Sequence, residues 1–223
     1  MELMVRNSYP GLFIAIEGID GSGLSTQTKL LAHSLKKDGF KVFPTKEPTD
    51  NVVGGLIRGT LTKSLDLPAH SLQLLFAADR GHHLQREIIP MLKTGSIVIT
   101  DRYAWTSIAY ETSDLGQDWL LKINQHFLKP DLTIFLKVSA KAALRRINKE
   151  RFHKELYETE SRMRKNIESY NSLMKKFSNS FKIVDGEKKI GQVTESALEI
   201  IRAYPKYKKL SKKVGHGKRS SKT

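Results

Sequence analysis

Cysteine is absent from this chain of 223 residues. Without thiols, the chain has no disulfide framework and no cysteine-based metal site. It also has no apolar run near the ~20 residues that a membrane-spanning helix needs, and residues 1–10 carry no hydrophobic signal core. We therefore expect a soluble protein of the cytoplasm that makes no membrane contact.

Acidic residues are fewer than basic ones. The chain has 23 Asp and Glu but 38 Lys and Arg, which gives a formal net charge of +15. Residues 206–223 contain eight of these cations and no acid. The sequence therefore predicts one α/β domain over residues 1–205, followed by a basic, flexible C-terminal tail over residues 206–223. Such a tail attracts nucleic acid non-specifically through its phosphates, although a plain solvated extension explains the composition equally simply.

A lysine is missing from the stretch that dominates the sequence, GIDGSGLST, which lies between an apolar, β-prone run and a helical pattern. The stretch meets the phosphate-loop pattern GxxxxGK(S/T) at Gly18, Gly23 and Ser25, but Leu24 occupies the lysine position. Most of the grip of such a loop comes from backbone N–H groups beside a helix N-terminus, which leucine keeps. The stretch therefore predicts a nucleotide-phosphate site that lacks its usual mobile positive charge, and a glycine-rich turn before a helix is the alternative.

Strand and helix patterns alternate along the chain. Helical spacing follows each strand pattern, and the long helical region over residues 69–93 is expected to break at Gly81. A βαβα order favours an α/β fold in which helices flank a doubly wound, five-stranded parallel sheet. The five expected strands are residues 12–17, 41–45, 96–100, 132–138 and 181–185.

Charged residues directly follow the third of these strands, at Asp101 and Arg102. Ligands of open parallel sheets bind at the carboxyl ends of the strands. A carboxylate on the magnesium side of a nucleotide, next to a guanidinium that binds phosphate, would explain the pair. A simple ion pair that caps the strand end is the alternative.

Four motifs, in this order and at about this spacing, resemble the thymidylate kinases, P-loop enzymes that pass the γ-phosphoryl of ATP to dTMP. They are EGIDGSG at residues 17–23, TKEPT at residues 45–49, LFAADR at residues 75–80, and DRY at residues 101–103 with Ala109-Tyr110 after it. The resemblance covers about residues 11–202. It implies the P-loop kinase fold, ATP and dTMP as substrates, Mg²⁺ as cofactor and a homodimer.

The resemblance also implies an acceptor pocket. Phe76 would stack on the thymine ring, Arg80 would hydrogen-bond the carbonyl edge of the base, and Arg102 would hold the 5′-phosphate. The full set of substrate-binding positions implied is Asp20, Glu47, Phe76, Arg80, Arg102, Ser107 and Tyr110.

On the ATP side, the resemblance implies a phosphate cradle, a metal-side pair formed by Ser25 and Asp101, and a mobile lid over about residues 145–158. Arg151 is the first candidate in this lid for the catalytic guanidinium, with Arg146 and Lys149 behind it, so the implied catalytic set is Asp20, Arg102 and Arg151. The ATP-binding positions implied are Gly18, Gly21, Ser22, Gly23, Leu24, Ser25 and Thr26.

Two classes of function follow from these features. The first is a kinase that converts dTMP to dTDP, on the route to dTTP, with arginines of the lid or pocket replacing the loop lysine. The second is a nucleotide-binding homologue with weak or no catalysis and a regulatory or nucleic-acid-associated role, which Leu24 and the basic tail both suggest. A kinase for another monophosphate or for a deoxynucleoside is a third possibility.

Overall fold

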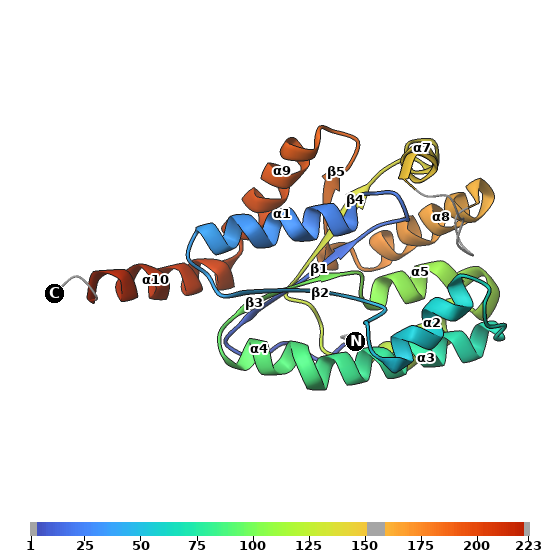
Figure 1. The fold of residues 1–223 in the computed structure, drawn as a ribbon, viewed down its shortest axis with the longest axis horizontal. Helices are drawn as coiled ribbons and strands as arrows, with labels where there is room; N and C mark the ends of the chain where they lie inside the picture. The colour runs from blue at the N-terminus through green and yellow to red at the C-terminus, as the bar shows by residue number, and fades with distance from the viewer. Residues whose placement is uncertain (1–3, 151–158, 221–223) are drawn as a thin grey trace.

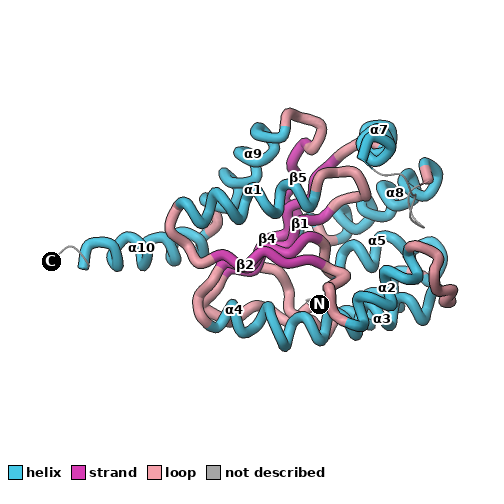
Figure 2. Tube along the Cα trace, in the orientation of Figure 1, coloured by secondary structure: helices cyan, strands magenta, loops and turns pink. Residues whose placement is uncertain are grey.

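The computed structural model describes residues 4–150 and 159–220. A parallel five-stranded sheet with the order β2-β3-β1-β4-β5 forms its centre, and helices cover both faces (Figures 1 and 2). This arrangement confirms the predicted doubly wound α/β fold. The strands are β1 Leu12–Glu17, β2 Val42–Lys46, β3 Ile97–Asp101, β4 Leu132–Lys137 and β5 Phe181–Asp185.

The helices follow the expected alternation, with a π-helical turn at Leu84–Ile88 and a 3₁₀ turn at Ser178–Ser180. In the described residues no helix is long and apolar enough to cross a membrane. The α-helices are α1 Leu24–Lys37, α2 Val52–Leu61, α3 Ala69–His83, α4 Ile89–Lys93, α5 Ala104–Leu115, α6 Gln117–Asn124, α7 Ala140–Glu150, α8 Glu160–Lys176, α9 Ile190–Ala203 and α10 Pro205–Ser220.

Both faces of the central strand β1 are buried, which explains its unbroken apolar sequence. Leu12 and Ile14 pack into the apolar cluster under α1 and α9, whereas Phe13 and Ala15 pack into the cluster on the side of α5 and α8. Because side chains alternate along a strand, the five apolar residues of this one strand fill two cores. The loop after β1 is thereby held at the centre of the sheet.

The sequence predicted a break at Gly81 in the helical region at residues 69–93, and this prediction is wrong. Gly81 lies within α3, and the irregular turn comes later, at Leu84–Ile88. Pro90 explains the shift, because a proline has no N–H to donate and its ring collides with the carbonyl four residues earlier. Widening the helix to a π turn just before Pro90 accommodates the ring.

The basic C-terminal segment differs from the flexible tail predicted, because residues 205–220 form helix α10. Tyr207 and Leu210 are buried, and the Tyr207 ring lies 4.9 Å from that of Phe40 (centroid to centroid). The three-residue spacing of these two apolar side chains, after Pro205 at the helix start, was the sequence signal for a docked helix. Figure 1 shows α10 at the end of the molecule away from α2 and α7.

Candidate active site

The glycine-rich loop joins the end of β1 to the N-terminus of α1. Gly23 is the N-cap of α1 and has φ 98°, in the left-handed region that favours glycine. Gly21 has φ 76°, and a Cβ atom there would lie 2.5 Å from the carbonyl oxygen of Ala143 on α7. Both glycines are therefore required by the backbone, which leaves the first N–H groups of α1 free to bind an anion.

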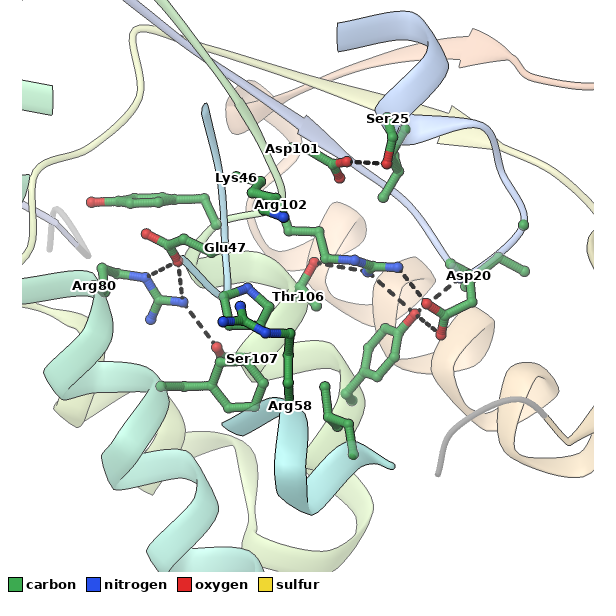
Figure 3. Close-up of a pocket in the computed structure, with 18 of the residues that line it drawn as sticks. Asp20, Ser25, Lys46, Glu47, Arg58, Arg80, Asp101, Arg102, Thr106 and Ser107 are labelled. Atoms are coloured by element: carbon green, nitrogen blue, oxygen red, sulfur yellow. Dashed lines mark hydrogen bonds and ion pairs between the residues drawn. The ribbon is translucent and has the colours of Figure 1, made fainter. Parts of the chain in front are cut away.

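A cavity of about 350 Å³ opens beside this loop, at the carboxyl ends of β1, β2 and β3 (Figure 3). Gly18 and Ser22, two of the predicted ATP-binding positions, do not line it. Arg151 lies outside the described residues. The predicted residues that do line the cavity are Asp20, Gly21, Gly23, Leu24, Ser25, Thr26, Glu47, Phe76, Arg80, Asp101, Arg102, Ser107 and Tyr110.

Leu24, the residue in the lysine position, is part of the protein core. Its side chain is 5% exposed and belongs to the apolar cluster under α1 and α9. The backbone N–H of Leu24 stays at the helix N-terminus, but its side chain brings no charge to the cavity it borders. The loop therefore keeps its backbone cradle and loses one cation.

Ser25 and Asp101, the two residues predicted to lie on the magnesium side, are in direct contact. The Ser25 hydroxyl donates to Asp101 Oδ2 over 2.5 Å. Burial raises the pKa of Asp101, while the charge of Arg102, the bond from Ser25 and the charge of Lys46 oppose the rise. The described residues hold no group of three His, Asp or Glu side chains able to cage a metal ion. One hydroxyl and one carboxylate fit Mg²⁺, which usually takes few protein ligands and fills its other positions with phosphate oxygens and water.

Arg102 lies at the centre of the cavity and pairs with Asp20 of the loop (Figure 3). Its Nη2 is 2.6 Å from Asp20 Oδ1, and its Nη1 donates to the Gly18 carbonyl over 3.1 Å. The Tyr110 hydroxyl donates to the other Asp20 oxygen over 2.8 Å. Arg102 also has φ 70°, a left-handed conformation that costs a non-glycine residue about 1–3 kcal/mol. The ion pair with Asp20 and the bond to Gly18 together fix this guanidinium beside the phosphate loop.

Arg80 lies in a buried polar cluster at the other end of the cavity. It is 1% exposed, and its Nη2 lies 2.8 Å from Glu47 Oε2. Nη1 donates to Asn124 Oδ1 over 2.5 Å, and Nη2 donates to Ser107 Oγ over 3.0 Å. Phe76 lines the cavity one helical turn before Arg80 on α3. The ring of Phe76 can stack on the face of a flat base, and the guanidinium of Arg80 lies where the edge of that base would be.

Two basic residues of the cavity were not among the predicted site residues. Lys46 ends β2 beside Asp101 of β3, and its ammonium lies 2.9 Å from Asp50. Arg58 of α2 donates to the Thr49 carbonyl and lies 3.5 Å from Asp50. Two signals could have identified them, since Lys46 stands at the carboxyl end of a strand and Arg58 is the single charge in an apolar helix.

The lid candidate Arg146 lies against the outer side of the phosphate loop. It donates to the carbonyls of Gly21 and Ser22 over 3.3 Å and to that of Gly186 over 2.7 Å. It is absent from the cavity lining. Arg146 of α7 therefore stabilises the phosphate loop from outside the cavity. Lys149 lies in α7, but its side chain is outside the described part of the structure.

A strand, a glycine loop and a helix N-terminus, combined with a carboxylate at the end of the adjacent strand, define a P-loop kinase. The thymidylate kinase family model matches residues 16–197. The chain belongs to the thymidylate kinase family.

Named relatives agree with this assignment. The curated "Probable thymidylate kinase" of Thermococcus onnurineus is 42% identical over 74% of this chain and 85% of its own length. Its counterpart from Pyrobaculum aerophilum is 38% identical over 88% of this chain and 99% of its own. A solved structure of thymidylate kinase from Candida albicans superimposes with a TM-score of 0.77 at 31% identity, covering 90% of this chain and 95% of that one.

Proposed function

We propose that this protein is an ATP:dTMP phosphotransferase that yields dTDP and ADP and uses Mg²⁺. One observation carries the proposal: a single cavity joins a phosphate loop, an arginine at its centre and a wall suited to a base. Family membership supports the same reaction. The assigned residue roles below are part of the proposal.

The acceptor dTMP would lie with its base against Phe76 and its 5′-phosphate against Arg102. Arg80 would donate to the carbonyl edge of thymine in exchange for its bond to Ser107, and its ion pair with Glu47 would hold it in place. Tyr110 bonds Asp20 and is buried, so it would crowd a 2′-hydroxyl and favour deoxyribose. These contacts select both the base and the sugar.

In the transfer itself, an oxygen of the acceptor phosphate attacks the γ-phosphorus of ATP, and the bond to the bridging oxygen of ADP breaks. Positioning and charge neutralisation provide most of the catalysis in this chemistry. Arg102 now pairs with Asp20, and the acceptor phosphate would take over part of that guanidinium. Asp20 would then orient Arg102 rather than take a proton.

Ser25 and Asp101 are the residues that would hold magnesium, Ser25 directly and Asp101 through water or its bond to Ser25. When bound, the ion neutralises charge on the phosphates of ATP. Burial raises the pKa of Asp101, and a bound cation would oppose that rise by favouring the carboxylate form.

Lys46 is our candidate for the charge that Leu24 does not supply. It borders the same cavity as Ser25 and Asp101 and has a flexible stem. Its counter-ion in the described structure, Asp50, lies on an exposed loop, so the ammonium can exchange this partner for a phosphate. Arg151 of the lid remains a second candidate.

The direct test mixes purified protein with Mg²⁺-ATP and dTMP and separates the products by ion-exchange chromatography. We expect dTDP and ADP in equal amounts, with dTMP used in preference to dUMP and thymidine. Ser25→Ala is the control, because it keeps the fold and removes the hydroxyl beside Asp101. Turnover no greater than that of this control would refute the proposal. The comparisons with known proteins offer no support for a non-catalytic homologue.

A homodimer and a cytoplasmic location also belong to the proposal. Val52 and Leu56 of α2 and Leu74 of α3 are large apolar side chains exposed on neighbouring helices. Large apolar side chains exposed on neighbouring helices are typical of a subunit interface. Light scattering after size exclusion should give twice the chain mass, and a monomer at micromolar concentration would contradict the dimer.

A further inference from the structure

A second hollow lies at the amino ends of β4 and β5, opposite the carboxyl ends that form the nucleotide cavity. It measures about 1010 Å³, and the start of α10 forms one wall. We call it the basal groove and define it by its charged lining, which consists of Arg6, Lys129, Asp131, Lys182, Lys206 and Lys209.

Positive charge in the basal groove is largely uncompensated. Asp131 is its single acid, and Lys206 lies 3.1 Å from both of its oxygens. Asp131 also accepts from Asn7 and from the backbone N–H of Phe13, so its charge is fully engaged. None of the remaining cations, Arg6, Lys129, Lys182 and Lys209, has an ion-pair partner among the described residues. Four like charges around one hollow favour an anionic occupant.

Aromatic side chains lie among these cations. Tyr9 and Tyr204 line the basal groove and are only partly buried. A positively charged groove with aromatic rings is the arrangement that binds single-stranded nucleic acid, because the cations follow the phosphates and the rings stack on bases. A stacked duplex cannot offer the faces of its inner bases in this way.

Helix α10 adds this wall outside the range matched by the family model, which ends at residue 197. It is fixed to the body by Tyr207 and Leu210, so Lys206 and Lys209 are held at the groove. Lys208 and Lys212 on the same helix are exposed. The basic charge of the C-terminal segment is thus positioned by a folded element.

We propose that the basal groove binds single-stranded nucleic acid, with phosphates against Arg6, Lys129, Lys182 and Lys209 and with bases stacked on Tyr9 and Tyr204. The surface is separate from the nucleotide cavity. Binding is therefore independent of the proposed kinase reaction.

The test measures fluorescence anisotropy of labelled single-stranded DNA, single-stranded RNA and duplex DNA over a series of salt concentrations. The groove variant is Lys182→Gln with Lys209→Gln. Lys122→Gln with Lys165→Gln is the matched control, since these two exposed lysines lie on α6 and α8 and the net charge changes equally. The logarithm of the binding constant falls linearly with the logarithm of the salt concentration, and each neutralised phosphate of a single strand contributes ~0.7 to the magnitude of that slope. Because the groove variant removes two cations, we expect the magnitude of its slope to be lower by about 1.4. The control variant should leave the slope unchanged.

Equal losses in both double variants would overturn the proposal and leave only diffuse attraction to a basic protein. Tight binding of duplex DNA, undiminished by Tyr9→Leu, would overturn the stacking part. The single-stranded DNA and RNA arms show which sugar the groove accepts. dTDP formation by the groove variant should equal that of the wild type, so failure of this proposal and failure of the kinase proposal give different results.

Discussion

Replacing Lys46 by alanine removes the proposed substitute for the loop lysine and leaves the fold intact. The Lys46 side chain is 53% exposed and its ion pair lies at the protein surface, so its loss costs little stability. In the proposed complex, however, the ammonium would stand beside the transferred phosphate. The effect should therefore appear in turnover rather than in folding.

The magnitude follows from the exposure of Lys46. Removal of one fully preorganised, water-excluded donor costs about 3–4 kcal/mol of transition-state stabilisation. Lys46 is half exposed and must leave Asp50, so we expect about 1.4–2.7 kcal/mol, which is a fall in kcat of about 10- to 100-fold. The KM for dTMP should change less than kcat, because Phe76 and Arg80 bind the base.

The assay compares kcat for the wild type, Lys46→Ala, Leu24→Lys and the double variant. Leu24→Lys places an ammonium at the usual loop position, so the double variant should recover much of the activity that Lys46→Ala loses. Lys36→Ala is the matched control, since Lys36 is exposed near the end of α1 and lines neither the cavity nor the hollow next to Lys46. Unchanged kcat in Lys46→Ala would refute the reasoning, as would a double variant that binds ATP but shows no recovery.

Three further predictions concern other parts of the site. Phe76→Ala should raise the KM for dTMP about 10- to 100-fold because the base no longer stacks, with the KM for ATP unchanged in the same steady-state assay. Arg102→Lys keeps the charge but loses the planar pair of donors, so kcat/KM for dTMP should fall about 10- to 100-fold; a value within twofold of wild type would contradict the role of Arg102. Burial raises the pKa of Glu17 from 4.5 to about 7, so the folded protein holds a proton that the unfolded chain releases between these pH values. Stability should therefore fall by roughly 3 kcal/mol as pH rises from about 4.5 to about 7, and urea unfolding at pH 5 and pH 8 should show no such fall in Glu17→Gln.

Local patterns in the sequence were enough to predict the fold. The expected strands at residues 12–17 and 181–185 coincide with β1 and β5. The apolar run of β1 reflects burial on both faces, whereas β5 lies at the edge of the sheet and buries only Phe181 and Val184. Gly81 misled the helix prediction, since glycine weakens a helix by only about 1 kcal/mol and tertiary packing outweighs that cost. Pro90, with its missing donor, was the stronger signal.

Short motifs were enough to predict most of the residues that line the cavity, but most of the side-chain bonds that join distant motifs were not predicted. The Ser25 and Asp101 pair was expected, whereas the bonds that fix Arg80 come from Glu47, Ser107 and Asn124, which lie on three different elements or loops. Side-chain reach is also invisible in a sequence. The place of Lys46 at the carboxyl end of β2 indicates the right edge of the sheet, but not that its ammonium borders the same cavity as Ser25.

Binding and turnover, measured in one preparation, test the central claim that this P-loop kinase works without its loop lysine. Calorimetry would follow ATP and dTMP binding, and a rapid-quench experiment with radiolabelled ATP would follow the γ-phosphoryl group. We predict that both nucleotides bind and that the label passes to dTMP, one dTDP for each ADP. Binding of both nucleotides with no transfer of label beyond the Ser25→Ala control would contradict this claim.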